Sequence, residues 1–187
     1  MSKLKDLIEM NPVIPAVNQA SQISEVIELE CEIVFVLFGN IMNLPRYVER
    51  LKAANKIVFI NIDLIDGLAG KKIAIDYIKK VAQADGVITS KASLIAEAKK
   101  ADLMTIHRYF ILDSRSLSAL NKQFELSRAD AIDIMPGLMP TVIQQIAESG
   151  PTPVIASGLV CTKQDILNAL NAGAAGISTT NNVCWTI

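Results

Sequence analysis

The chain alternates between short apolar runs and longer stretches in which apolar residues recur at helical spacing. Runs that are apolar on both faces and are joined by helices are typical of parallel strands with crossover connections. The apolar runs begin at Pro12, Ile33, Lys56, Gly86, Leu103, Asp130, Pro153 and Gly176. The helical stretches between them are Ser21–Leu29, Leu44–Ala54, Lys71–Val81, Ser93–Lys100, Ser114–Leu126, Pro140–Ser149 and Lys163–Asn171.

This repeat predicts an α/β fold with a closed sheet. A flavodoxin-like open sheet uses about five strands, so the longer series favours a small TIM-type (β/α)8 barrel. The chain stops at Ile187 shortly after the last apolar run, and we therefore expect the last helix to be short or missing. No linker or low-complexity segment interrupts the pattern, so residues 1–187 are predicted to form a single domain.

Composition narrows the class of protein. The chain is 51% hydrophobic with a net charge of −1, which is typical of a compact soluble protein and excludes a disordered one. No apolar run approaches the roughly 20 residues of a membrane helix, and Asp6 and Glu9 argue against a signal peptide. The cysteines, Cys31, Cys161 and Cys184, form neither a metal motif nor a disulfide framework, which favours a reducing cytoplasm.

The last two predicted strands carry the signature of an anion site. Pro153–Leu159 and Ala174–Asn181 are strands of small and β-branched residues that run directly into Gly, Ser, Thr or Asn. Backbone N–H groups at such strand-to-helix turns bind anions, and the loops after the seventh and eighth strands of a barrel are a common phosphate site.

Polar residues inside the other strands indicate a mouth with further binding groups. The period of two places Asn61 and Asp63 on one face, and Asp133 on the face of its strand that carries Ala131 and Met135. His107 and Arg108 are adjacent and must point to opposite faces. Asp63, Arg108 and Asp133 together favour a ligand site, whereas the lone His107 is more typical of a structural histidine.

Lys91 follows the fourth apolar run, where it either faces the mouth as a phosphate-binding cation or simply begins a helix. No Walker loop, dinucleotide fingerprint or spaced Cys/His cluster occurs, so neither metal nor cofactor is predicted. Asp63 and Asp133 are available in principle as an acid and a base, although nothing in their spacing requires it.

Lysines gather on two neighbouring helical stretches. A solvated lysine-rich surface explains this pattern, and so does a footprint for nucleic acid. The lysines concerned are Lys71, Lys72, Lys79, Lys80, Lys99 and Lys100.

The sequence as a whole resembles the glycerol uptake operon antiterminator family. The resemblance covers almost the full length and depends on distinctive blocks that generic barrels do not share. These blocks are Asn11–Val17, Val34–Gly39, Asp63–Leu68, Ala84–Lys91, Thr105–Ser114, Asp130–Pro140, Ser157–Gly158 and Ser178–Asn181.

The resemblance implies a regulator that senses glycerol 3-phosphate, binds leader mRNA and antiterminates transcription of glycerol-utilisation genes. It implies that the phosphate lies on the backbone around Ser157, Gly158 and the run Ser178, Thr179, Thr180 and Asn181. Asp63 and Asp133 would accept hydrogen bonds from the glycerol hydroxyls, and Arg108 would balance the charge.

Three positions depart from the family pattern, in which a histidine usually stands at Asn61, a glycine at Ser157 and a basic residue at Cys161. The ligand is therefore either glycerol 3-phosphate or a related phosphorylated polyol. The alternative function is a barrel enzyme, an isomerase or hydrolase acting on a small phosphorylated polyol or sugar. A short last helix would leave apolar surface near Trp185, which favours a homodimer.

Overall fold

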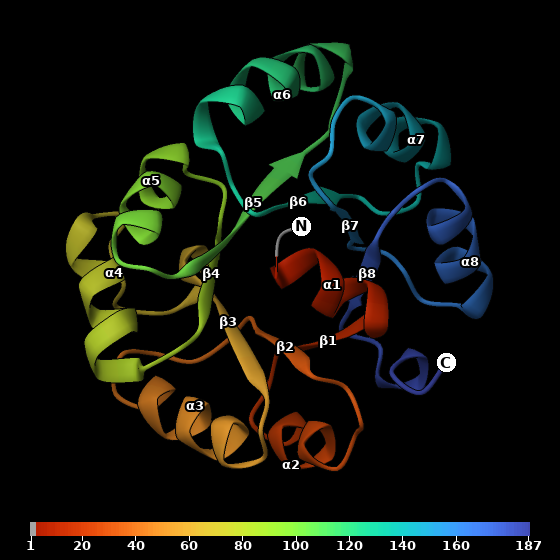
Figure 1. Ribbon diagram of the computed structural model, residues 1–187. Coiled ribbons are helices and arrows are strands. Elements are labelled where there is room, and N and C mark those ends of the chain that lie inside the picture. The colour runs from red at the N-terminus through yellow and green to blue at the C-terminus, as the bar shows by residue number, and fades with distance from the viewer. Residues whose placement is uncertain (1–2) are drawn as a thin grey trace.

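The computed structural model describes residues 3–187, with the backbone alone for residues 3 and 121–127. Its strands form one closed barrel in the order β1 to β8, and each strand pairs in parallel with its neighbours (Figure 1). The predicted TIM-type barrel is therefore confirmed. The strands are β1 (Val13–Val17), β2 (Ile33–Val36), β3 (Ile57–Asn61), β4 (Gly86–Thr89), β5 (Met104–Phe110), β6 (Ala131–Met135), β7 (Val154–Ser157) and β8 (Gly176–Thr179).

Helices connect the strands on the outside of the barrel (Figure 1). Each predicted helical stretch contains a helix, and β8 is followed only by η3, a 3-10 turn, so the expected short last helix is confirmed. The helices are α1 (Lys3–Met10), α2 (Gln22–Ile27), α3 (Leu44–Ala53), α4 (Lys72–Tyr77), α5 (Ala92–Lys100), α6 (Ser114–Ser127), α7 (Pro140–Glu148) and α8 (Lys163–Asn171). The short elements are η1 (Ile62–Leu64), η2 (Ile78–Ala82) and η3 (Asn182–Cys184).

The barrel interior is a packed core. Phe35 and Phe59 meet edge to face inside it, with ring centroids 5.7 Å apart. Gly86 makes room for this pair, because a Cβ at that position would lie 2.3 Å from the Phe59 ring. Separate apolar clusters fill the space between the strands and the surrounding helices, so the strands are buried on both faces.

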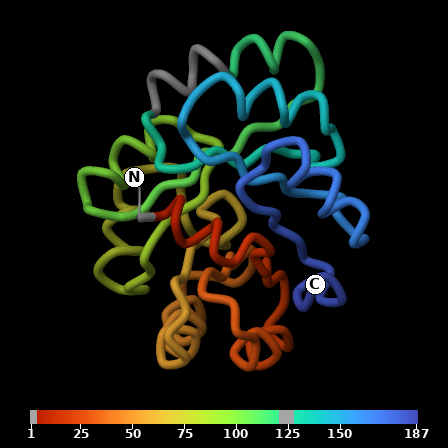
Figure 2. The backbone as a smooth tube through the Cα atoms, turned by 45° about the vertical axis from the view of Figure 1, so that its right-hand side comes forward, coloured from red at the N-terminus to blue at the C-terminus, as the bar shows by residue number. Residues whose placement is uncertain are grey.

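The first helix, which the periodicity analysis did not assign, closes one end of the barrel. Figures 1 and 2 show α1 lying across the barrel opening. Its Leu4 and Ile8 are buried in the same cluster as the interior residues of the strands. Gly176 permits this close approach, because a Cβ there would lie 2.6 Å from the Ile8 Cγ2 atom. The opposite end, where the strands have their carboxyl termini, remains as the mouth.

Within the described residues, the helices are all too short or too polar to cross a membrane.

Candidate functional site at the barrel mouth

A pocket of about 190 Å³ opens at the mouth beside the ends of β7 and β8. Most of the residues predicted to bind the ligand contribute to its wall. Apolar side chains from β1, β2, β6 and the loop after β7 complete it. The lining residues are Ala16, Leu37, Arg108, Met135, Ser157, Gly158, Leu159, Val160, Cys161, Ser178, Thr179, Thr180 and Asn181.

Backbone donors are available at this pocket. Gly158 and Leu159 adopt left-handed backbone angles, with φ of 74° and 63°, and form a tight turn directly after β7. In the described part of the chain, the N–H groups of Gly158, Leu159 and Thr180 donate to no other protein group. Free N–H groups in a turn attract an anion. The pocket therefore offers donors of the kind that phosphate requires.

The N-terminus of α8 is capped by Thr162 and by a side chain from its own first turn. The Asp165 carboxylate accepts hydrogen bonds from the N–H groups of Cys161 and Thr162. The Thr162 hydroxyl accepts one in return from the Asp165 N–H. The Thr162 side chain, followed by the N–H groups of Cys161 and Thr162, lowers the pKa of the Asp165 carboxyl. An anion in the pocket would therefore not replace the cap of α8.

Two side chains join the loops that form the pocket. The Thr179 hydroxyl donates to the Val160 carbonyl at 2.7 Å, and the Asn181 amide donates to the Cys161 carbonyl at 2.9 Å. Both bonds connect the end of β8 to the loop after β7. Thr179 and Asn181 thus fix the relative position of the two backbone segments that carry the free N–H groups.

A buried ion pair lies at the inner side of the pocket. Arg108 Nε donates to Asp133 Oδ2 at 2.6 Å, and the two residues are only 7% and 0% exposed. Arg108 also lines the pocket, so its guanidinium connects the pocket to the barrel interior. Asp133 Oδ1 and Ser157 Oγ are buried without a hydrogen-bond partner among the described residues. Such groups are uncommon in folded proteins, and these two are available to hydrogen-bond a ligand or water.

Asp63 and Lys91 lie outside the lining of this pocket. The Asp63 carboxylate accepts hydrogen bonds from Ser90 N at 2.7 Å, Ser90 Oγ at 2.9 Å and Thr89 Oγ1 at 3.0 Å, and it lies 3.7 Å from Lys91 Nζ. It therefore stabilises the loop between β4 and α5.

The strand pattern that we expected to reach Asp63 ends at Asn61. Asn61 Oδ1 accepts a hydrogen bond from the Asp63 N–H and turns the chain into η1. The expectation that Asn61 and Asp63 share a strand face is therefore wrong.

The environment of His107 is that of a structural residue, buried and hydrogen-bonded within the protein. Its side chain faces away from that of Arg108, as adjacent positions on a strand require. It is 1% exposed, its Nε2 lies 3.3 Å from the Ser90 carbonyl, and its Nδ1 lies 2.6 Å from the Tyr109 hydroxyl. Because a carbonyl only accepts, Nε2 carries the proton and Nδ1 accepts from Tyr109. Burial lowers the pKa of His107, with the Ser90 carbonyl and Asp63 acting in the opposite direction.

We expect His107 to make the stability of the protein depend on pH. Because its pKa in the folded state lies below the ordinary value of 6.5, the stabilising contribution is complete above pH 6.5. That contribution is lost as the pH falls towards the folded pKa, with a slope of at most about 1.4 kcal/mol per pH unit. Urea unfolding between pH 7.5 and 5 measures it, and the His107→Gln variant should show a flatter profile. Identical profiles for the two proteins would contradict this assignment.

Comparisons with known proteins agree with the barrel fold. A family model described as glycerol-3-phosphate responsive antiterminator matches residues 13–185. The chain belongs to this family. It is 41% identical over 184 residues to the uncharacterised Escherichia coli protein YgcP, covering 98% of this chain and 96% of that protein.

Two solved structures carry the family description. The glycerol uptake operon antiterminator regulatory protein of Listeria monocytogenes is 27% identical, with a TM-score of 0.89 over 93% of this chain and 94% of that one. The antiterminator-related protein of Thermotoga maritima is 32% identical, with a TM-score of 0.84 over 95% and 99%. A deoxyribose-phosphate aldolase from Aeropyrum pernix shares only the fold, at 15% identity.

The three positions at which this antiterminator-family chain departs from the expected pattern all lie at or near the mouth. Ser157 and Cys161 line the pocket, the former buried and the latter exposed. Asn61 is buried at the end of β3 and bonded to the backbone of Asp63. Two of the three departures therefore lie where they would contact a ligand in this pocket.

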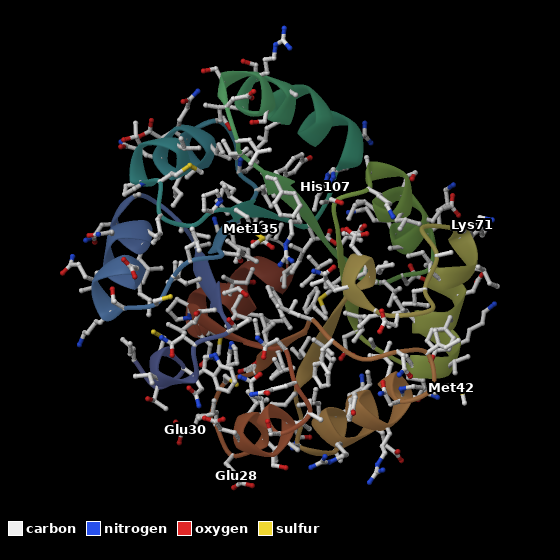
Figure 3. All side chains as sticks on the ribbon, turned by 180° about the vertical axis from the view of Figure 1, so that it is seen from behind. Glu28, Glu30, Met42, Lys71, His107 and Met135 are labelled. Atoms are coloured by element: carbon white, nitrogen blue, oxygen red, sulfur yellow. The ribbon has the colours of Figure 1, made fainter. Side chains whose placement is uncertain are left out.

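The lysines proposed for RNA are partly neutralised in this family member. Lys99 pairs with Asp130 at 2.8 Å, Lys80 with Asp76 at 3.3 Å, and Lys79 donates to the Asp102 carbonyl. The hydrogen bond from Lys100 lowers the pKa of Glu97, and Lys72 acts in the same direction. Lys71 and Lys72 begin α4 at the mouth, whereas Lys99 and Lys100 end α5 at the opposite end. Figure 3 shows Lys71 at the outer edge and Met135 near the centre.

Apolar surface is exposed near Trp185, as expected, at Val183 (74%) and Ile187 (47%), whereas Trp185 itself is buried. It is 6% exposed, packs in a core cluster and donates its indole N–H to the Thr179 carbonyl at 2.9 Å. The short chain after β8 thus folds back over the gap that a longer helix would fill.

Sequence reasoning missed the apolar part of the pocket wall, above all Leu159. A leucine directly after the Ser157–Gly158 turn was the available signal.

Among the residues that the structure describes, no group of three or more His, Cys, Asp or Glu side chains is placed to hold a metal ion.

Proposed function

We propose that this protein is a cytoplasmic regulator that binds a small phosphate ester at the mouth pocket and acts on leader mRNA by antitermination. The ligand is glycerol 3-phosphate or a related phosphorylated polyol. The observation that carries the proposal is the pairing of free backbone N–H groups at Gly158 and Thr180 with a buried arginine, Arg108, in one pocket.

In the proposed complex the phosphate lies against the N–H groups of Gly158, Leu159 and Thr180, beside the Ser178 hydroxyl. The polyol then extends towards Arg108 and Ser157, where hydroxyl groups meet hydrogen-bonding side chains. Asp133 supports this arrangement by holding Arg108. Asp63 and Lys91 have no direct role in this pose, because they lie outside the pocket lining.

An enzyme acting on the same kind of ligand would need a group that transfers protons at the pocket. The titratable side chains in the pocket wall are Arg108 and Cys161, and Asp133 behind it is bound to Arg108. This composition favours binding without turnover. A mobility-shift assay on leader RNA with and without the ligand separates the two functions, because an enzyme would instead convert the ester.

We expect glycerol 3-phosphate to raise the stability of the protein, whereas glycerol alone has no effect. At a hundred times its dissociation constant, a ligand specific to the folded state adds about 2.7 kcal/mol to the free energy of unfolding. Thermal melting curves with each compound measure this stabilisation.

A pair of glycine variants serves as the matched test. Gly158→Ala should abolish the stabilisation, because Gly158 has a φ of 74° and the new Cβ would lie 2.6 Å from Met135 Cε. Gly150→Ala is the control, since that site has no atom within 4 Å of the added Cβ. A ligand that stabilises both variants equally would place the phosphate elsewhere.

A further inference from the structure

Four large apolar side chains stand exposed on consecutive loops of the mouth, next to the pocket. We call them the apolar strip: Phe110 (51% exposed), Leu112 (84%), Leu138 (43%) and Leu159 (69%). The loops that carry them are joined by backbone hydrogen bonds, from Ile111 N to the Met135 carbonyl at 2.8 Å and from Gly137 N to the Gly158 carbonyl at 3.1 Å. The segments that carry the four side chains therefore lie side by side at the mouth.

The strip continues the wall of the pocket. Leu159 belongs to both, since it lines the pocket and is mostly exposed. The pocket wall beside it is formed by Met135, Val160, Leu37 and Ala16. Leu159 thus brings exposed apolar surface to the edge of the anion-binding turn.

The backbone of Leu159 gives an independent reason to connect this residue with a ligand. Its φ of 63° is in the left-handed region, which leucine disfavours and which glycine or asparagine adopts readily. Because the side chain is not buried, packing inside the protein does not compensate for this conformation. Disfavoured backbone angles of this kind concentrate at ligand contacts.

We infer that this pocket, besides the phosphorylated polyol of the proposed function, also binds soluble phosphate monoesters that carry an apolar substituent. This inference rests on the proposed phosphate site. The phosphate meets the free N–H groups and the Arg108 guanidinium, which complement its charge. The pocket of about 190 Å³ encloses the phosphate and the first carbons, and the remainder of the substituent lies along Leu159 on the apolar strip.

The test is the affinity of a series of alkyl phosphates for the full chain by titration calorimetry. Methyl, n-propyl and n-hexyl phosphate share one anion and differ only in apolar length. Each methylene buried on the strip is expected to tighten binding about fourfold. Leu159→Asn should remove most of this dependence on chain length, so that the three esters bind this variant with similar affinities, because asparagine adopts the left-handed backbone but lacks the apolar side chain. Leu64→Asn, at an exposed leucine in η1, is the control.

The outcomes separate this inference from the proposed function. If glycerol 3-phosphate binds but n-hexyl phosphate binds no tighter than methyl phosphate, the inference is overturned and the proposed function stands. If none of the phosphate esters binds, both fail. A length-dependent gain that survives in Leu159→Asn overturns the role of the strip. Binding to phosphatidate vesicles without a gain for free alkyl phosphates also overturns it, because the strip would then be a membrane contact.

Discussion

Replacement of Arg108 by methionine is expected to lower the free energy of unfolding by about 3–5 kcal/mol, because it removes one partner of a buried ion pair. Asp133 is completely buried, and its Oδ1 has no hydrogen-bond partner among the described residues. Without the Arg108 guanidinium its other oxygen would also lose its partner, leaving a carboxylate that must stay charged and unpaired or take up a proton. Urea unfolding at pH 7 measures the loss.

A double variant separates the cost of the orphaned charge from the cost of altered packing. Combining Arg108→Met with Asp133→Leu removes both charges, and a buried pair replaced by apolar residues is often as stable as the original. We therefore expect the double variant to recover most of the stability but to lose the response to glycerol 3-phosphate, since the pocket would lack its guanidinium. A single variant within about 1 kcal/mol of wild type, the range of an exposed ion pair, would show that the pair is not effectively buried.

The barrel was predictable because its signal is local. Each strand is an apolar run short enough to be distinguished from a helix, and each crossover has its own apolar stripe. Strand starts such as Ile33 and Gly86 agree with the predicted run starts, because these strands are buried on both faces. The tight turn after β7 was predictable for the same reason, since glycine and small residues directly after a strand mark such a turn, and phosphate binding there stays a prediction.

What the sequence did not reveal depends on contacts between distant segments. Asp63 lies at the mouth as expected, but outside the pocket lining, and its carboxylate binds Ser90 in the next loop, a partner that no spacing identifies. Lys99 and Lys79 formed a basic patch in the sequence, and in the fold Asp130 and the Asp102 carbonyl engage them. The sequence did not distinguish Leu159 from the other leucines, because its exposure and its left-handed backbone angle are known only from the structure.

The helix that closes the barrel is the largest feature that the periodicity analysis left unassigned. Its apolar positions Leu4 and Ile8 are four residues apart, which is helical spacing, but a helix of eight residues is marginal by itself. Contact with the barrel interior supplies the missing stability, as both side chains are buried among strand residues. The helical spacing was therefore present in the sequence, but the helix is stable only because the end of the barrel buries its apolar side chains.

Truncation of Ile8 to alanine is therefore expected to cost about 2–5 kcal/mol, the range for isoleucine in a core that does not collapse around the cavity. Ile8 is fully buried and contacts the space that Gly176 leaves open, so the cavity would form at the barrel end. Met10→Ala is the control in the same helix, since Met10 is 68% exposed and its loss should change stability by less than about 0.5 kcal/mol. Urea unfolding of both variants measures the difference. Equal stability of the two variants would mean that α1 does not close the barrel. The expected difference in their free energies of unfolding would show that this helix is part of the core on which the geometry of the mouth depends.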